Sequence, residues 1–329
     1  MKVLILAGGF ATRLWPLSET HAKPLLLING KSILAHLYDK IPAEYEVILL
    51  TNKKFEAQFA DEIKKINRTH NTTIFCEDAH SDGEKLGALG AISLACEQFH
   101  INENLFILAG DNILPDLDLE KLACKEHEGK IVVRTVPNKH EARKFGVIEP
   151  AQNWQENPFN FEVATFEEKP NEPKSTMVST GFMCLGKDNI PVLQAYAKKS
   201  PDALGGIFME LLHQKIPVKA TTVSGDWFDI GSFTTYLEAH EKLQTEPVLC
   251  DQNTYQQNNK LSGKVFIGEN CVIENCRLHN TIIYPNTKLK NCIISQSVID
   301  EHCELDGLDL NQKFIRQQTK LINENPQTI

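Results

Sequence analysis

The first 26 residues, MKVLILAGGFATRLWPLSETHAKPLL (residues 1–26), decide how the rest of the chain is interpreted. Residues 3–7 form an apolar run typical of a buried strand, and Gly8 and Gly9 follow it directly. Glycines after a buried strand let backbone N–H groups approach an anion with no Cβ in the way. Arg13 and Lys23 can then grip phosphate oxygens. We therefore expect a phosphate cradle in this segment.

Two better-known phosphate-binding loops are excluded by residue spacing. Residues 29–32, NGKS, resemble the end of a Walker A loop, but that motif requires glycine where the chain has Leu25. Residues 7–12, AGGFAT, do not contain the G-x-G-x-x-G pattern of dehydrogenase-type dinucleotide folds. The expected phosphate cradle is therefore neither of these two loops.

Composition excludes several classes of function. The 329 residues carry 34 Lys and Arg against 43 Asp and Glu, and this net charge of −9 disfavours a nucleic-acid partner. The longest uncharged stretch, residues 175–186, is shorter than the roughly 18 residues that span a bilayer, so we expect no membrane partner. The nine cysteines include no C-x-x-C pair, which indicates free thiols and a cytoplasmic protein.

Residues 1–244 alternate between strand-like and helix-like segments, and we assign them to one catalytic domain. The βαβα order predicts an α/β fold with a mostly parallel sheet covered by helices, whose ligands bind beyond the carboxyl ends of the strands. The expected strands are residues 3–7, 46–51, 72–77, 104–110 and 130–136. The expected helices are residues 32–40, 55–67, 87–99 and 118–127.

A different pattern follows the catalytic domain. Residues 245–257 are polar and are assigned to a linker, and residues 258–312 repeat every sixteen positions with aliphatic residues in register. This period predicts a short β-helix of about three coils. A short antiparallel sheet is the alternative interpretation. Residues 313–329 are expected to form a tail or a helix, and the cysteines of the repeat are expected to be small packing residues.

The opening motif, L-A-G-G-x-x-T-R-L-x-P-L followed by K-P-L-L, resembles the sugar-1-phosphate nucleotidyltransferases, or NDP-sugar pyrophosphorylases. The resemblance covers nearly the whole chain and is greatest to glucose-1-phosphate thymidylyltransferases and mannose-1-phosphate guanylyltransferases. It implies a Rossmann-like mixed sheet of the nucleotide-diphospho-sugar transferase type, with a left-handed β-helix after it. Further matching motifs are residues 86–90 (LGALG), 109–111 (AGD), 145–149 (FGVIE), 167–170 (EEKP), 179–181 (STG) and 227–231 (WFDIG).

The resemblance also implies a reaction and a cofactor. A sugar-1-phosphate would attack the α-phosphorus of an NTP in line and release pyrophosphate, with Mg²⁺ as the metal. Positioning and charge neutralisation would supply the catalysis. Asp111 and Asp229 are the metal ligands that the family pattern nominates, and hard carboxylate oxygens suit Mg²⁺.

The same resemblance assigns roles to other residues. Arg13 would contact the β- and γ-phosphates, Lys23 the α-phosphate and Lys169 the phosphate of the sugar; Arg13, Lys23 and Asp111 are the expected catalytic residues. The expected nucleotide-binding residues are Leu6, Ala7, Gly8, Gly9, Thr12, Arg13, Glu77, Gly87 and Asp111. The expected residues of the sugar-phosphate side are Gly146, Glu168, Lys169, Thr180 and Gly181.

Each assignment has a simpler alternative. A lone Gly-Asp after a strand is usually a turn, and Glu168 beside Lys169 is usually a solvated charge pair. None of the eleven histidines lies in a catalytic or metal-binding pattern. Trp227 is expected to be packing support for Asp229.

The chain departs from the family pattern in two places. Residues 10–11, Phe-Ala, stand where many members have Gly-x-Gly, so the loop is expected to follow a somewhat different path. Residues 77–85 are acidic, and Glu77 or Glu84 is expected to read the base where a Gln often does so. A carboxylate does not by itself choose between thymine, uracil and guanine.

Three functions are compared. The first is an active nucleotidyltransferase that makes an activated hexose for polysaccharide or glycan synthesis. The second is a catalytically silent, NDP-sugar-binding regulatory subunit, which the presence of all the expected charged residues disfavours. The third adds an acyltransferase in the repeat, for which about three coils are too few. We expect a homo-oligomer, with the β-helix in packing or oligomer contacts.

Overall fold

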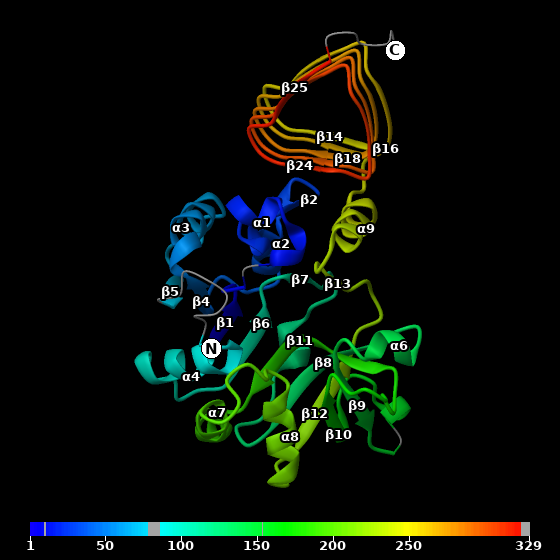
Figure 1. Cartoon of the computed structure of the whole chain (residues 1–329). Helices are drawn as coiled ribbons and strands as arrows, with labels where there is room; N and C mark the ends of the chain where they lie inside the picture. Colours follow the sequence, from blue (N-terminus) through cyan, green and yellow to red (C-terminus); the bar gives the residue numbers. More distant parts are fainter. Residues whose placement is uncertain (10, 78–85, 153, 324–329) are drawn as a thin grey trace. The chain divides into compact units, whose positions relative to one another are not determined.

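The computed structural model describes residues 1–9, 11–77, 86–152 and 154–323 (Figure 1). The chain divides into two compact units, one made of Met1–Phe10 and Leu34–Asp229, the other of Ala11–Ile33 and Ile230–Ile329. Residues 11–33 and 230–244 of the expected catalytic domain group with the repeat rather than with the sheet.

A nine-stranded mixed sheet forms the first unit, with strand order β5-β4-β1-β6-β11-β8-β12-β10-β9. Strands β5, β4, β1 and β6 run parallel, and β11 turns the direction by pairing antiparallel with β6 and β8. All five expected strands are present. The strands are β1 (Lys2–Leu6), β4 (Glu46–Asn52), β5 (Thr72–Glu77), β6 (Leu105–Ala109), β8 (Gly129–Thr135), β9 (Gly146–Pro150), β10 (Phe161–Glu168), β11 (Met177–Leu185) and β12 (Val218–Thr222).

Helices α4 (Ala88–Gln98), α7 (Ile190–Ala197) and α8 (Gly206–His213) bury the main core against this sheet. Shorter or peripheral helices are α2 (Ile33–Tyr38), α3 (Glu56–Lys65), α5 (Leu119–Leu122) and α6 (Lys139–Ala142). The expected helix at residues 118–127 is wrong beyond its first turn. Asp118 caps α5, but residues 123–127 carry no side chain that the core buries, so nothing continues the helix.

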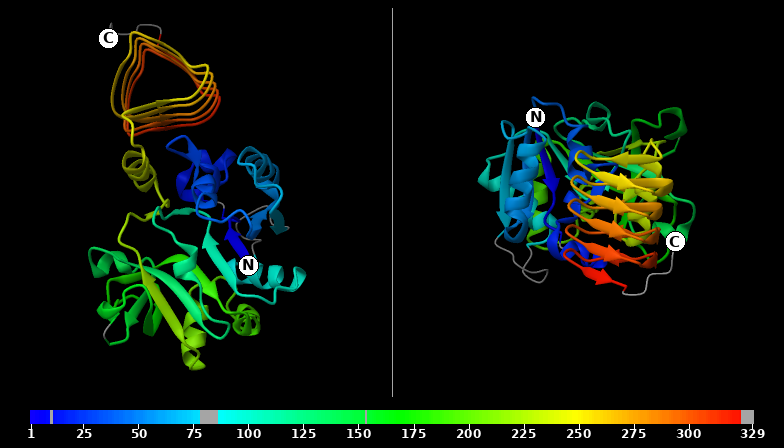
Figure 2. Two further views of the ribbon diagram at one scale, coloured as in Figure 1. Left: turned by 180° about the vertical axis from the view of Figure 1, so that it is seen from behind. Right: turned by 90° about the horizontal axis from the view of Figure 1, so that it is seen from above.

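The second unit contains a β-helix whose coils stack in parallel with the predicted sixteen-residue register (Figures 1 and 2). Ile273, Leu289 and Leu305 are aligned on successive coils and are buried. One ladder is β14 (Val248–Cys250), β16 (Lys260–Ile267), β18 (Arg277–Ile283), β20 (Ile293–Ser295) and β23 (Asp309–Asn311), joined by β21 (Val298–Ile299) and β24 (Phe314–Ile315). The other is β15 (Tyr255–Gln257), β17 (Val272–Glu274), β19 (Lys288–Lys290), β22 (Glu304–Asp306) and β25 (Lys320–Ile322).

The β-helix is longer than expected at both ends. Residues 245–257 are not only a linker, because β14 and β15 pair with the next coil, and β24 and β25 extend the ladders into the expected tail. The expectation of about three coils is therefore too low, since the second ladder alone has five strands. The first coil was not predicted because Tyr255, Gln256 and Gln257 are all exposed, so no apolar repeat marks it.

Polar side chains turn the coils at regular corners. Asn270, Asn286 and His302 have φ of 57°, 59° and 56°, in the left-handed region that asparagine tolerates. A small donor follows each of these residues. Cys271 Sγ, Thr287 Oγ1 and Cys303 Sγ donate to carbonyls of the next coil at 3.2, 3.0 and 3.1 Å. These cysteines pack as expected, and all nine thiols in the chain are free.

Residues 11–33 add small elements to the second unit: η1 (Thr12–Leu14), α1 (Leu17–Thr20), η2 (Lys23–Leu25) and a hairpin of β2 (Leu27–Ile28) and β3 (Lys31–Ser32). The NGKS stretch that resembles a Walker A end is this hairpin turn, with φ of 53° at Asn29 and 71° at Gly30. Positive φ at both central residues is the type I′ geometry that Asn-Gly favours. Helix α9 (Phe233–Leu243) follows a capping box at Ser232.

Candidate active site

The carboxyl ends of β1, β4 and β6 converge at the first glycine bend. Ala7 N–H donates to Leu50 O at 2.8 Å, and Gly110 N–H donates to Leu6 O at 2.9 Å. Asn52 Nδ2 donates to Gly8 O at 3.1 Å. The bend after β1 is therefore held from both neighbouring strands, at the sheet edge where α/β folds bind ligands.

Glu77 lies beside this bend. Its side chain is almost fully buried, and a Cβ placed on Gly8 would lie 3.6 Å from Glu77 Oε1. Its other oxygen, Oε2, accepts from Leu86 N–H at 3.1 Å, next to the positive-φ residue Gly87. The structure thus joins Gly8, Glu77 and Gly87. The alternative base reader, Glu84, lies outside the described residues.

The backbones of Asp111 and Asp229 lie close together at a two-stranded sheet. Strand β7 (Asn112–Ile113) pairs antiparallel with β13 (Phe228–Asp229), and Asp229 lies directly opposite Asn112. Residues opposite each other in such a pair have Cα atoms about 4.5–5.5 Å apart. Because Asp111 immediately precedes Asn112, two carboxylates from distant parts of the chain lie at neighbouring backbone positions.

Asn112 and Trp227 support Asp111 in a way that the sequence analysis missed. Asn112 Nδ2 donates to Asp111 Oδ1 at 2.8 Å, and Asn112 Oδ1 accepts from Trp227 Nε1 at 2.7 Å. The Trp227 ring also packs on Phe145, with centroids 5.0 Å apart. Trp227 therefore acts on Asp111 through Asn112, whereas packing support for Asp229 was expected. The polar residue directly after Gly110-Asp111 was the signal for this role.

We expect Trp227→Phe to weaken this chain of hydrogen bonds. Phenylalanine keeps an aromatic ring but leaves the buried Asn112 oxygen without its donor, so the free energy of unfolding should fall by about 1–3 kcal/mol. Urea denaturation measures the loss, and Trp154→Phe, a ring contact of Phe161 elsewhere in the unit, is the control. Equal stability of the Trp227 variant and the wild type would contradict the assignment.

Glu168, the last residue of β10, lies against two glycines. Cβ atoms placed on Gly146 and Gly205 would lie 3.1 and 2.2 Å from Glu168 Oε2, so both glycines make room for this carboxylate. Burial raises the pKa of Glu168, and Lys169, whose Nζ is 4.0 Å from Oε1, offsets only part of the shift. The structure brings Gly146, Glu168 and Lys169 together and adds Gly205, which the sequence analysis missed.

Thr180 and Gly181 lie on β11, where its pairing with β8 shifts register. Thr180 is buried and its hydroxyl donates to Val132 O at 3.0 Å, so this side chain ties two strands together. Gly181 has a φ of 84°, and a Cβ there would lie 3.0 Å from the Ala109 side chain, at the end of β6. Gly181, unlike the Thr180 hydroxyl, therefore adjoins the strand that leads to Asp111.

Thr12, Arg13 and Lys23 belong to the second unit. The side chains of Thr12 and Arg13 are exposed, and Lys23 begins η2 and is half-buried. Ala11, which precedes them, has a φ of 47°. Position 11 is where the family pattern has glycine. Ala11 keeps there the left-handed backbone conformation that favours glycine.

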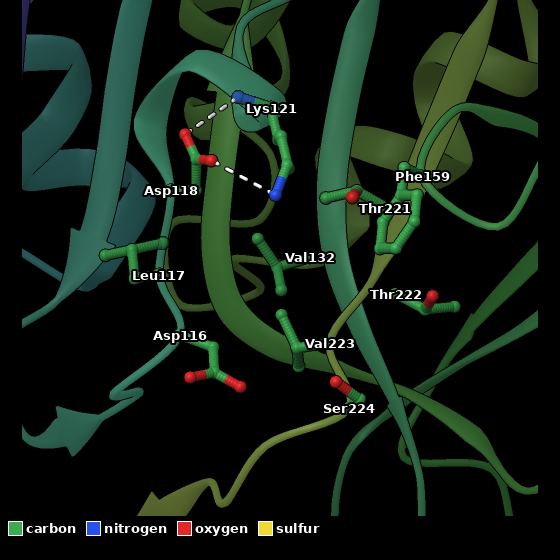
Figure 3. Close-up of a pocket in the computed structure, with 10 residues that line it drawn as sticks. All are labelled: Asp116, Leu117, Asp118, Lys121, Val132, Phe159, Thr221, Thr222, Val223 and Ser224. Atoms are coloured by element: carbon green, nitrogen blue, oxygen red, sulfur yellow. Dashed lines mark hydrogen bonds and ion pairs between the residues drawn. The ribbon is translucent and has the colours of Figure 1, made fainter.

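A pocket of about 370 Å³ lies elsewhere in the first unit (Figure 3). Among the described residues that line it, Lys121 is the only cation and is paired with Asp118 at 3.3 Å, and Asp116 adds a second carboxylate. Phe159, Thr221, Thr222 and Ser224 also line it. The lining residues that the structure describes include none of the expected site residues, and their negative charge does not suit a phosphate.

The described residues contain neither a metal-binding cluster of three side chains nor a helix that could cross a membrane. Within residues 1–9, 11–77, 86–152 and 154–323, no three His, Cys, Asp or Glu side chains gather closely enough to hold a metal ion. A site of two carboxylates, such as Asp111 and Asp229, lies below that number and is common for Mg²⁺. In the same part of the chain, no helix has the length and apolar character needed to cross a membrane.

The mixed sheet, with a glycine bend at the carboxyl ends of its parallel strands, is typical of α/β proteins that bind nucleotides. The chain belongs to the Nucleotidyl transferase family, whose model matches residues 2–246.

Curated relatives extend over most of the chain. A mannose-1-phosphate guanyltransferase of Schizosaccharomyces pombe is 27% identical, with 82% of this chain and 74% of the relative covered. A glucose-1-phosphate thymidylyltransferase of Streptomyces griseus is 24% identical over 96% of this chain and 87% of the relative. The bifunctional protein GlmU of Methanocaldococcus jannaschii is 25% identical over 83% of this chain, but the chain spans only 61% of that protein.

A solved structure supports the fold. A UDP-glucose pyrophosphorylase complexed with UDP-glucose superposes with a TM-score of 0.61 at 20% identity, covering 73% of this chain and 97% of that one. The mixed α/β sheet expected from the sequence is therefore confirmed.

Proposed function

We propose that this chain condenses a sugar-1-phosphate with an NTP to give an NDP-sugar and pyrophosphate. The observation that carries the proposal is the β7–β13 pair, in which Asp229 lies opposite Asn112, the residue after Asp111. This pair belongs to the unit that also contains the Gly8 bend and Glu168. Family membership supports it, as do the names of relatives that act on mannose-1-phosphate and glucose-1-phosphate.

The proposed step forms one bond and breaks one. A phosphate oxygen of the sugar-1-phosphate attacks the α-phosphorus, and the bond from that phosphorus to the pyrophosphate oxygen breaks. No side-chain nucleophile takes part, so the protein contributes positioning and charge neutralisation. The free thiols of the chain support a reducing, cytoplasmic setting.

Different residues would bind the metal, the phosphates, the nucleotide and the sugar. Asp111 and Asp229 would hold Mg²⁺, which neutralises phosphate charge when bound. Asn112 keeps the Asp111 carboxylate oriented. We propose that Arg13 binds the β- and γ-phosphates, Lys23 the α-phosphate and Lys169 the sugar phosphate. The bend at residues 6–9 with Thr12, Glu77 and Gly87 would bind the nucleotide, and Gly146, Glu168, Thr180 and Gly181 would line the sugar side.

We expect Glu168→Gln to stabilise the folded protein and to weaken its binding of sugar-1-phosphate. Because burial raises the pKa of Glu168, the ionised form is less favourable in the folded chain than in the unfolded chain. Stability is therefore lost as the pH rises from the ordinary value of 4.5 through the raised one, and a neutral Gln avoids that loss.

At pH 7 the variant should melt at a higher temperature, while its KM for sugar-1-phosphate rises about tenfold or more. Glu162→Gln, an exposed position on the same strand, should change neither quantity. A lower melting temperature with an unchanged KM would contradict this role of Glu168.

A panel of NTPs with glucose- and mannose-type 1-phosphates tests the proposal. We expect pyrophosphate release with one preferred pair, with dTTP or GTP as the leading nucleotides. No release with any pair, combined with thermal stabilisation by an NDP-sugar, would overturn the proposal and favour the catalytically silent, ligand-binding alternative.

A further inference from the structure

Lys23 lies between two points at which its segment is tied to the rest of the second unit. The first point is His21, two residues before Lys23. His21 Nε2 lies 2.9 Å from Asp300 Oδ1, in the loop after β21 of the β-helix. Asp300 is completely buried, and the same oxygen accepts from Glu301 N–H at 2.8 Å. The other carboxylate oxygen, Oδ2, is buried without a hydrogen-bond partner. His21 is therefore the side chain that compensates this buried charge.

The second point is Leu27, four residues after Lys23. Leu27 N–H donates to Tyr284 Oη at 3.0 Å, and the Tyr236 hydroxyl donates to Leu27 O at 2.6 Å. The two hydroxyl oxygens are 2.9 Å apart. Because Tyr236 has already used its only proton, Tyr284 must donate in that bond. The three bonds close a ring around the Leu27 peptide, and both tyrosines are buried.

Between these two points, every second residue is buried. Ala22 and Leu26 are fully buried and Pro24 is buried, while Lys23 is half-buried. Gly30, just beyond, fits closely against the repeat, since a Cβ there would lie 3.2 Å from Leu249 and 3.3 Å from Phe266. The backbone at Lys23 is thus fixed from both sides by groups of the β-helix and of α9.

We infer that the β-helix is a positioning element for nucleotide binding: Asp300 through His21, and Tyr284 with Tyr236 through Leu27, hold the Lys23 turn in the conformation that presents its ammonium to a phosphate. The inference rests on the proposed contact of Lys23 with the α-phosphate. It gives the repeat a role in the reaction, distinct from oligomer contacts or acyl transfer. His21, Asp300 and Tyr284 act through Lys23 and are positioning residues.

The charges around His21 make the stabilising contact between His21 and Asp300 dependent on pH. Burial lowers the pKa of His21, but the hydrogen bond to Asp300 and the negative charges of Asp300 and Glu301 outweigh burial, so the net pKa is raised. The Tyr284 ring packs 5.5 Å away, and Glu19 of the neighbouring α1 is paired with Arg316 at 3.0 Å. The stabilisation is complete below the ordinary pKa of 6.5 and is lost as the pH rises through the raised value.

The experiment is steady-state kinetics of the full chain with each substrate varied separately between pH 6 and pH 9. For the wild type, we expect the KM for NTP to rise with pH while the KM for sugar-1-phosphate stays constant. His21→Gln should raise the KM for NTP about tenfold at pH 6 and remove its pH dependence. The same change in a Lys23→Ala background should add nothing further. His302→Gln, an exposed corner of the same coil, is the matched control.

Tyr284→Phe keeps the ring and removes the proton that closes the Leu27 ring, so it tests the second point even if His21→Gln fails to fold. It should also raise the KM for NTP selectively. An unchanged KM for NTP in a folded variant, or an equal rise for both substrates, overturns the inference alone. If the wild type shows no turnover, the proposed function fails instead, and equilibrium dialysis of the NTP across the same variants decides the inference.

Discussion

Asp111→Asn and Asp229→Asn should each reduce turnover by about a thousandfold or more while leaving the fold intact. Each change removes the negative charge that a divalent cation requires but keeps the shape of the side chain. Both residues lie at the β7–β13 pair, and Asn112 would still donate to the amide oxygen of an asparagine at position 111. The measurement is pyrophosphate release with saturating substrates, alongside far-ultraviolet circular dichroism.

Asp61→Asn, an exposed aspartate on α3, is the control for the same chemical change elsewhere in the unit. It should leave turnover at the wild-type level. Full activity in both site variants would remove the two aspartates from the mechanism. A loss in only one of them would show that the carboxylates do not share an ion.

Gly87→Ala should destabilise the first unit by about 3 kcal/mol or more. Gly87 has a φ of 79°, and an added Cβ would lie 2.6 Å from the backbone oxygen of Pro201. That oxygen cannot move aside easily, because it accepts from the N–H groups of Leu89 and Gly90 at 2.7 and 3.2 Å. Since Gly87 is the N-cap of α4 and follows Leu86, whose N–H donates to Glu77, we also expect the variant to bind NTP more weakly.

Gly90→Ala is the matched control, one turn further along α4. Its Cβ would meet Leu86 and Pro201 side chains at 3.4 Å, an ordinary contact, and alanine is favoured over glycine in a helix by about 0.5–1 kcal/mol. Thermal and urea unfolding should therefore show that Gly87→Ala is less stable than the wild type and that Gly90→Ala is more stable. If both variants have the stability of the wild type, the conformation assigned to Gly87 is wrong.

The parallel half of the sheet could be predicted from sequence because its strands are buried on both faces. Runs such as residues 46–51 and 104–110 have nearly continuous apolar character, and the structure places β4 and β6 there. The sixteen-residue period likewise predicted the β-helix, because each inward aliphatic residue must meet its counterpart on the next coil.

Other features depend on tertiary pairing that no local pattern reveals. Asn112 acquires its role only because β13 brings Trp227 to it from far along the chain. Gly205 is needed because the Glu168 carboxylate folds against it. Residues 11–33 group with the β-helix through buried contacts such as His21 with Asp300, which have no sequence signal of their own.

If Asp111 and Asp229 bind one divalent ion, anomalous diffraction from crystals that contain Mn²⁺ and an NTP will locate that ion. We expect a single Mn²⁺ peak with carboxylate oxygens of both residues within about 2.2 Å, and loss of that peak in Asp229→Asn. A peak bound by Asp111 with other residues, and without Asp229, would contradict this expectation.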